Sequence, residues 1–254
     1  MSGARGSAVW VERTWPEIQE TLAGGCVAIL PVGATEPHGP HLPLSTDVII
    51  AEEMSRRCVA RLAARGRHAL VLPAVAYSVT DWSDGFAGRL SLPAETARTH
   101  LCDVIVAAQR SGAACVAIAN AHLEPAHVKV VRDAVAAAGE KTGRAAVFPD
   151  VTRRKLAERL GDAFRSGDHA GGYETALVLA ARPDLVREPV RRALEPVRDS
   201  LIERIQAGAR SFAEAGMTQA YTGDPARATR LEGERLFDIL GGLLEEAVLE
   251  ALGD

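Results

Sequence analysis

The chain has 254 residues, of which 47% are hydrophobic and 24% are charged, and its formal net charge at pH 7 is −4. This apolar content is enough for a substantial core and excludes the composition of a disordered protein. The mildly acidic charge, with arginines scattered along the chain, argues against nucleic-acid binding.

No Ser/Gly-rich linker or charge run divides the chain, so residues 1–254 are expected to form a single domain. Its four cysteines occur singly in apolar or helical segments, as is typical of proteins from a reducing compartment. The start of the chain lacks the apolar core of a secretory signal, and no run approaches the ~18 apolar residues of a membrane span. We therefore expect a cytoplasmic protein that does not enter a membrane.

Strand-like apolar runs alternate with segments of helical periodicity after a Gly- and Ser-containing start, residues 1–9, that we expect to be frayed. Strands are predicted at residues 26–32, 69–77, 114–120 and 145–148. Helices are predicted at residues 14–22, 47–65, 93–110, 125–138, 152–160, 196–212 and 228–252. This alternation predicts an α/β fold with a mostly parallel sheet and helices on both of its faces.

Three polar clusters follow predicted strands or precede predicted helices. They lie within residues 35–47, 120–124 and 168–174. The potential metal ligands or proton carriers in them are Glu36, His38, His41, Asp47, His122, Glu124, His169 and Glu174. Because ligands of open parallel sheets bind outside the carboxyl ends of the strands, these clusters are expected to converge there.

The spacing within the first two clusters indicates a pair of metal ions. Glu36 and His38 are two residues apart, so in extended backbone both side chains point to the same side; His122 and Glu124 repeat this spacing. Asp47, at a helix N-terminus, can bridge two ions with its two oxygens. Oxygen and imidazole ligands without thiolate suit Zn, Mn or Fe, and two such ions make a bridging hydroxide available for hydrolysis.

Several of these residues also have structural interpretations. His41 is either a direct ligand or a partner that supports one. Glu174 can instead be a helix N-terminal charge favoured by the dipole, and His169 an ordinary loop histidine. The remaining histidines, His68, His100 and His127, are expected to be structural.

At these residues the chain resembles the creatininase (creatinine amidohydrolase) family, from about residue 15 to residue 185. The most specific segment is residues 30–47, LPVGATEPHGPHLPLSTD, in which Pro37 stands where the family usually has Gln. The resemblance implies a three-layer α/β/α sandwich and assembly as a homo-oligomer, commonly a hexamer. Substrates known in the family include creatinine, formamidopyrimidine nucleotides, a peptide in cofactor maturation and a cyclic inosose.

The resemblance also implies roles for individual residues. One metal would be held by Glu36, Asp47 and His122, and the other by His38, Asp47 and Glu124. The segment around His169 is similar to the family's His-Ala-Gly motif, so His169 would be the catalytic histidine that passes a proton to the leaving nitrogen. Glu124 is expected to contribute to catalysis as well as to metal binding, and Glu174 matches a Glu-Thr pair that follows the motif.

Two departures from the family pattern concern the substrate. Residues 120–125 read NAHLEP where many relatives have Asn-Gly-His-Gly-Gly-Asn, and Glu124 brings this position nearer to creatininase itself. The usual Glu-His pair before a Phe-Pro-Gly-Thr segment is missing from residues 81–89. Trp82, Arg89 and Glu174 are the candidate substrate-binding residues, although Arg89 could equally form a surface salt bridge.

The sequence therefore predicts a dinuclear metal amidohydrolase that cleaves a C–N bond of a small amide, cyclic amide or formamide. Two alternatives stay open within the family: a peptidase, and a hydrolase that opens a carbocycle. A third alternative is a non-catalytic binding protein that keeps metal only for structure, which closed ligand shells would favour.

Overall fold

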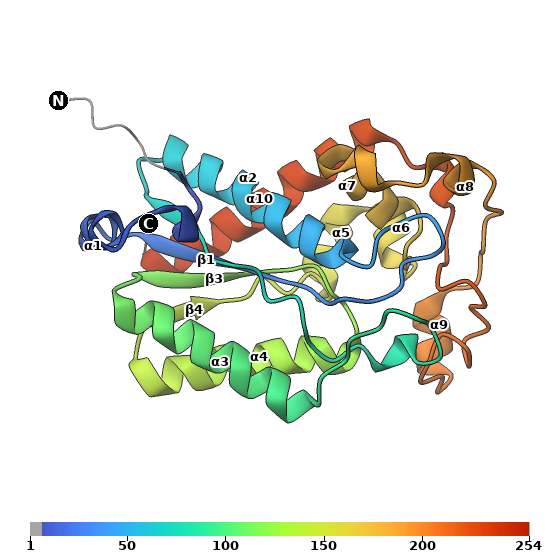
Figure 1. Ribbon diagram of the computed structural model, residues 1–254, viewed down its shortest axis with the longest axis horizontal. Coiled ribbons are helices and arrows are strands. Elements are labelled where there is room, and N and C mark those ends of the chain that lie inside the picture. The colour runs from blue at the N-terminus through green and yellow to red at the C-terminus, as the bar shows by residue number, and fades with distance from the viewer. Residues whose placement is uncertain (1–6, 254) are drawn as a thin grey trace.

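The computed structural model describes residues 7–253 and arranges them in three layers around a parallel sheet (Figure 1). The predicted frayed start lies mostly in residues 1–6, outside the described residues. The strands are β1 (Val27–Val32), β2 (Ala69–Val71), β3 (Cys115–Asn120) and β4 (Ala145–Val147). Their order in the sheet is β2-β1-β3-β4, and every neighbouring pair is parallel.

Helices cover both faces of this sheet. The α-helices are α1 (Trp15–Ala23), α2 (Thr46–Ala64), α3 (Ala94–Ser111), α4 (Pro125–Thr142), α5 (Arg154–Leu160), α6 (Asp162–Arg165), α7 (Gly172–Ala181), α8 (Glu188–Arg192), α9 (Leu201–Gln206) and α10 (Arg230–Leu252). Short 3₁₀ turns are η1 (Trp10–Glu12), η2 (Asp81–Ser83), η3 (Pro183–Leu185) and η4 (Pro225–Arg227). Figure 1 shows α3 and α4 on one face and α2 and α10 on the other. The predicted three-layer α/β/α sandwich is confirmed.

Two hydrophobic clusters pack against the two faces of the sheet. Alternate residues of β1 enter different clusters: Val27 and Ile29 pack toward α2, α7 and α10, and Ala28 and Leu30 pack toward α3 and α4. All six residues of β1 and of β3 are buried, as expected for central strands that helices cover on both sides.

The sequence prediction was wrong about the second strand and the helix at 196–212. β2 ends at Val71 because Pro73, which has no N–H, follows soon after, although Val75 still donates a hydrogen bond to Pro31 of β1. Val197 forms a two-residue bridge with Gly223, so the helix there begins only at Leu201, after Ser200 accepts a hydrogen bond from the Glu203 N–H.

Three helices were missed or misjudged. The sequence prediction left α6, α7 and α8 unassigned, and α7 is the one that matters because it carries Glu174 and Thr175 in its first turns. Close packing requires two of the three glycines of α10, Gly233 and Gly241: a Cβ at Gly241 would lie 2.8 Å from Cβ of Arg57 in α2. A Cβ at Gly233 would lie 1.9 Å from the carbonyl oxygen of Ala176 in α7.

No helix in the described part of the chain is long and apolar enough to cross a membrane.

Candidate metal centre

The centre lies where β1 and β3 end against the start of α2. Gly33 follows β1 and touches α2, since a Cβ there would lie 2.8 Å from both Cβ of Asp47 and the Val48 nitrogen. The backbone N–H of Ala34 donates to Oδ2 of Asp47 over 3.2 Å. Only glycine permits this approach, which places the loop carrying Glu36 and His38 directly beside Asp47.

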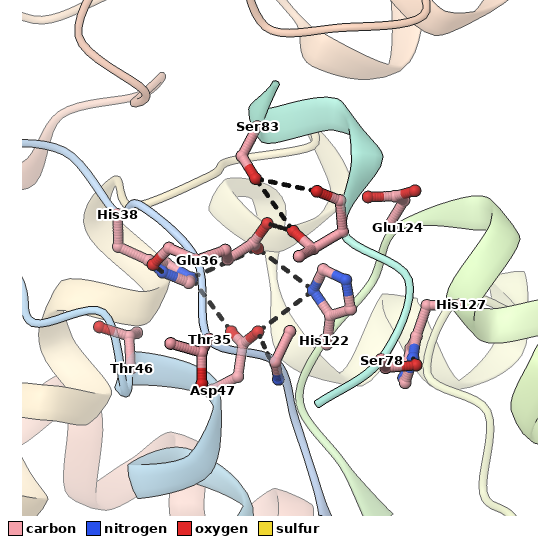
Figure 2. A network of polar contacts seen from close by, with 12 residues as sticks. Thr35, Glu36, His38, Thr46, Asp47, Ser78, Ser83, His122, Glu124 and His127 are labelled. Atoms are coloured by element: carbon pink, nitrogen blue, oxygen red, sulfur yellow. Dashed lines mark hydrogen bonds and ion pairs between the residues drawn. The ribbon is translucent and has the colours of Figure 1, made fainter. Parts of the chain in front are cut away.

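Asp47 lies between the two imidazoles of the site (Figure 2). Its Oδ1 is 3.0 Å from Nε2 of His38, and its Oδ2 is 3.1 Å from Nδ1 of His122. Nδ1 of His122 also lies 3.2 Å from Oε1 of Glu36. These side chains are at most 3% exposed, so the cluster lies in an interior of low dielectric.

The protons on the two imidazoles can be assigned from their outer contacts. His38 donates from Nδ1 to the Glu36 carbonyl over 3.1 Å, and His122 donates from Nε2 to the Val79 carbonyl over 2.8 Å. A carbonyl oxygen can only accept, so the opposite nitrogen of each neutral ring has a lone pair aimed at carboxylates. Lone pairs and carboxylates that face one another require a cation between them, either a proton or a metal ion.

The pKa directions show the same demand for positive charge. Burial alone would lower the pKa of His38, but Asp47, Glu174 and Glu36 raise it to about 10. Burial would also lower the pKa of His122, but the negative charges of Glu36 and Asp47 outweigh this effect and raise it well above its usual value. Burial would raise the pKa of Glu36, but His122 lowers it to about 2. Without metal, two imidazolium protons would therefore offset two carboxylates, and divalent ions can replace those protons.

Within residues 7–253, three groups of side chains have ligand atoms within 4.8 Å of one another, and their members are all buried. The groups are Glu36 with Asp47 and His122, His38 with Asp47 and Glu174, and Glu36 with His38 and His169. Nε2 of His38 and Oδ1 of Asp47, both in the second group, have no hydrogen-bond partner among the described residues. Buried polar atoms without partners are costly unless a ligand satisfies them, so the residues fit a metal ion.

The first group contains the three ligands that the sequence resemblance implies for one metal. At the second position the structure groups His38 and Asp47 with Glu174, where the resemblance implies Glu124. Glu124 instead lies at the start of α4, and its Oε2 accepts a hydrogen bond from the Trp82 N–H over 3.2 Å. Burial raises the pKa of Glu124. Glu174 was difficult to recognise from sequence because a glutamate in the first turn of a helix is common for dipole reasons alone.

His169 belongs to the third candidate group, together with Glu36 and His38. Its ring is stacked between His38, at 4.7 Å, and Phe212, at 4.4 Å, and it donates from Nε2 to the Pro37 carbonyl over 3.0 Å. Burial, followed by the charge of His38, lowers the pKa of His169 to about 4. A neutral imidazole with Nδ1 unprotonated can accept a proton at neutral pH.

Buried contacts around the centre hold the candidate ligands in place. His41 lies outside the three groups, and its Nε2 is 2.9 Å from Oγ1 of Thr175, which follows Glu174. Thr80 donates a short hydrogen bond from its hydroxyl to Glu36 and lies 3.1 Å from the Ser83 hydroxyl. Sequence reasoning missed Thr80 and Ser83, because a hydroxyl residue in a loop carries no pattern that distinguishes it.

A cavity of about 680 Å³ opens onto this centre. Glu36, Glu174, His122, His169 and Glu124 line its polar end, and Trp82 lies beside them. Residues from the segment predicted as one long helix form an apolar wall, which consists of Leu201, Ile202, Ile205 and Phe212. The centre is therefore accessible to a ligand.

Arg89 is not among the residues lining this cavity. Its guanidinium lies 3.3 Å from Asp81 and 3.0 Å from Asp84, in the salt-bridge arrangement that was the alternative to substrate binding. The arginines that do line the cavity are Arg132, Arg154 and Arg165.

Known proteins resemble this chain in sequence over most of its length. The family model for creatinine amidohydrolase matches residues 11–248. A mycofactocin precursor peptide peptidase of Mycobacterium tuberculosis (strain ATCC 25618 / H37Rv) is 34% identical over 221 residues, covering 82% of this chain and 79% of the relative. A creatinine amidohydrolase of Pseudomonas putida is 29% identical over 192 residues, covering 69% of this chain and 72% of the relative.

Solved structures share the fold. A crystal structure of creatinine amidohydrolase superposes with a TM-score of 0.78 at 23% identity, covering 97% of this chain and 98% of that one. A creatininase described as the Mn form and a mutant creatininase of the Zn-Zn type each give a TM-score of 0.76 at 24% identity, covering 96% of this chain and 98% of theirs.

Proposed function

Because this chain belongs to the creatininase family of hydrolases, we propose that it cleaves the C–N bond of an amide, cyclic amide or formamide with two divalent metal ions. The observation that carries the proposal is Asp47, whose two oxygens face two different imidazoles, each with a lone pair aimed at it. The Mn and Zn-Zn forms of creatininases of the same fold support Mn or Zn as the ions.

We assign the ligands of one ion as Glu36, Asp47 and His122, and those of the other as His38, Asp47 and Glu174. When bound, such ions would lower the pKa of a water molecule and polarise the substrate carbonyl. Burial raises the pKa of Glu174 to about 8, so metal binding would be accompanied by loss of its proton.

The protein's own side chains would then manage the protons. His169, neutral at pH 7, accepts a proton at Nδ1 when water adds to the carbonyl carbon and delivers it to the nitrogen as the C–N bond breaks. The hydrogen bond to the Pro37 carbonyl keeps the other ring nitrogen protonated throughout. Glu124, at the cavity surface and hydrogen-bonded to the Trp82 backbone, is placed to orient the substrate or the attacking water.

Metal analysis combined with one substitution tests this proposal. The purified protein should retain close to two equivalents of Zn or Mn, and Asp47→Ala should lose both ions, since it removes the bridging ligand. Amide hydrolysis should fall by more than about 100-fold. This exceeds the loss expected when a residue that only supports a ligand is removed, which is at most about 100-fold. A wild-type protein without tightly bound metal, or an Asp47→Ala variant with unchanged hydrolysis, contradicts the proposal.

The cavity also supports a second candidate, a peptidase. Its volume of about 680 Å³ lies in the range that holds drug-sized ligands, and one of its walls is apolar, whereas a small polar amide would fill only part of this volume. The mycobacterial relatives named as precursor peptide peptidases favour the same reading.

Comparing kcat/KM for creatinine, a formamide and a series of short peptides distinguishes the two candidates. If the substrate reaches the apolar wall, Ile205→Asp should raise KM for peptides with apolar side chains and leave small amides unaffected. Equal effects of Ile205→Asp on both substrate classes would exclude the wall as a binding surface.

A further inference from the structure

A second buried histidine, His127, lies directly behind the candidate ligand His122. The two rings are 4.6 Å apart and tilted by 53°. Figure 2 shows His127 and Ser78 on the side of His122 that faces away from Asp47 and Glu36. His127 is 1% exposed, and sequence reasoning treated it as structural without assigning it a partner.

His127 is part of a hydrogen-bond network with Asn120 and Ser78, and the partners in this network determine where each proton lies. Nδ2 of Asn120 donates to the His122 carbonyl over 2.6 Å, so Oδ1 of Asn120 is the acceptor that faces Nε2 of His127 at 2.7 Å. His127 therefore carries its proton on Nε2. Its Nδ1 must accept from the Ser78 hydroxyl, which lies 2.6 Å away.

This hydrogen-bond network contacts His122 at two points, its backbone carbonyl and its ring. Asn120, held by His127, binds the His122 carbonyl, and Val79, adjacent to Ser78, accepts the hydrogen bond from the His122 ring. Residues 78 and 79 thus anchor both imidazoles, one through a side chain and the other through a carbonyl. Fixing the ring and its backbone together leaves Nδ1 of His122 pointed at Asp47 and Glu36.

The order Ser, His, Asn resembles a nucleophile with its base and an orienting amide, but burial excludes that role. Ser78 is 3% exposed, and neither it nor His127 lines the cavity, so no substrate carbonyl can reach the hydroxyl. The side-chain hydrogen-bonding atoms of Ser78, His127 and Asn120 bind one another or the His122 carbonyl, as in a supporting network.

We propose that Ser78, His127 and Asn120 are positioning residues that pre-orient His122 for one of the two metal ions. The proposal rests on the metal centre proposed above. Residues that hydrogen-bond to a metal-binding histidine and orient it commonly change metal affinity by about 10- to 100-fold. For His122, this network adds to the hydrogen bond that its ring donates to the Val79 carbonyl.

Zinc binding by Ser78 variants tests the proposal. Competition with a chromophoric chelator should show two tightly bound Zn²⁺ ions in the wild type and one of them weakened about 10-fold or more in Ser78→Ala. Ser78→Thr retains the hydroxyl and should restore the affinity. Ser55→Ala is the matched control, because it also removes a buried serine hydroxyl, one that donates to the Ala51 carbonyl within α2 and not to His127.

A Co²⁺ spectrum provides a readout that general destabilisation would not change. Ser78→Ala and His127→Phe should alter the d–d bands of one Co²⁺ ion while Ser55→Ala leaves them unchanged; His127→Phe keeps the ring and removes both hydrogen bonds. Unchanged affinity and spectrum in Ser78→Ala, or equal losses in Ser78→Ala and Ser55→Ala, would overturn the positioning role alone. A wild type that binds no metal would overturn the metal centre and this inference together.

Discussion

At the scale of single residues, Glu174 and Glu124 are the two candidates for the third ligand of the proposed second metal ion. Oε2 of Glu174 lies 3.8 Å from Nε2 of His38, whereas Glu124 belongs to none of the ligand groups among the described residues. Both carboxylates line the cavity and accept a backbone hydrogen bond, Glu124 from Trp82 and Glu174 from Ala170, so proximity to His38 and Asp47 is what separates them.

We therefore predict opposite results for two isosteric substitutions. Glu174→Gln should lower the bound metal from two equivalents to one, because an amide oxygen is a weaker ligand than a carboxylate. Glu124→Gln should retain both ions and lose hydrolytic activity. Metal content measured after gel filtration decides between them, and loss of one ion from Glu124→Gln alone would restore the assignment implied by the family resemblance.

Asp168 precedes His169 and links protonation to stability. Its Oδ1 is buried without a hydrogen-bond partner among the described residues, and burial raises its pKa to about 7 from an ordinary value of about 4. Between these two pH values the folded state binds more protons than the unfolded chain. The free energy of unfolding should therefore decrease as the pH rises through this window.

Asp168→Asn should accordingly stabilise the metal-free protein at pH 8, because the amide resembles the protonated acid and carries no charge. The gain in melting temperature should shrink as the pH is lowered toward 4. Asp184→Asn is the control: Arg182 lowers the pKa of this exposed carboxylate, so no gain at pH 8 is expected. A gain for Asp168→Asn that is independent of pH would contradict the linkage argument.

At the scale of elements, the crossing of α7 and α10 determines where Glu174 lies. α10 approaches α7 so closely at Gly233 that an added Cβ would be 1.9 Å from the Ala176 carbonyl oxygen. Since Ala176 lies two residues after Glu174, this contact fixes the first turns of α7 relative to α2 and the sheet.

Gly233→Ala should destabilise the protein by about 1–3 kcal/mol through overpacking, despite the better helix propensity of alanine. Gly139→Ala, within α4, is the matched control, because a Cβ there would meet no heavy atom within 4 Å. That variant should be more stable by about 0.5–1 kcal/mol. Urea unfolding of both variants measures the difference, and equal effects would show that the helices separate easily.

The segment around α9 shows how an apolar pattern can be misread. Leu201, Ile205 and Phe212 recur at helical spacing, which predicts one helix face packed on a core. The actual helix spans only Leu201–Gln206, because Val197 pairs with Gly223 and Gly208 adopts a left-handed conformation. Phe212 and Leu201 pack in a small separate hydrophobic cluster, and all three apolar side chains also line the cavity.

At the scale of the whole molecule, the candidate metal centre joins the two central strands of the sheet to α2 and α7. Its candidate ligands come from the loop after β1, the start of α2, the end of β3 and the start of α7. Ions that bind this folded arrangement should stabilise the entire domain by mass action.

Removing metal should therefore lower the melting temperature. At a free metal concentration 100 times Kd, one site contributes about 2.7 kcal/mol, which corresponds to about 5–10 °C for a chain of this size. The metal-free protein should unfold in a single transition, because its two hydrophobic clusters share one sheet. Asp47→Ala should melt at the same temperature with and without chelator; a chelator effect there would place the stabilising ion elsewhere.

The expected assembly into a homo-oligomer, with a hexamer as the family precedent, stays a prediction. Sedimentation equilibrium of the metal-loaded protein tests it.

The sequence by itself determined the layered α/β architecture and most of the residues that converge in the candidate metal centre. Alternating strand and helix periodicities require a parallel sheet, and parallel strands bring the segments after β1 and β3 to the same edge. Glu36, His38, Asp47 and His122 lie within a few residues of those strand ends, so their convergence follows from local pattern alone.

Only the tertiary structure grouped Glu174, and not Glu124, with His38 and Asp47, placed Arg89 in a salt bridge and brought His127 behind His122. These depend on contacts between segments far apart in the chain: α7 against α10, Arg89 against Asp81 and Asp84, and His127 against Ser78. Periodicity reports which face of an element is buried. It cannot report which distant side chain meets that face, since that depends on how helices cross and how loops return.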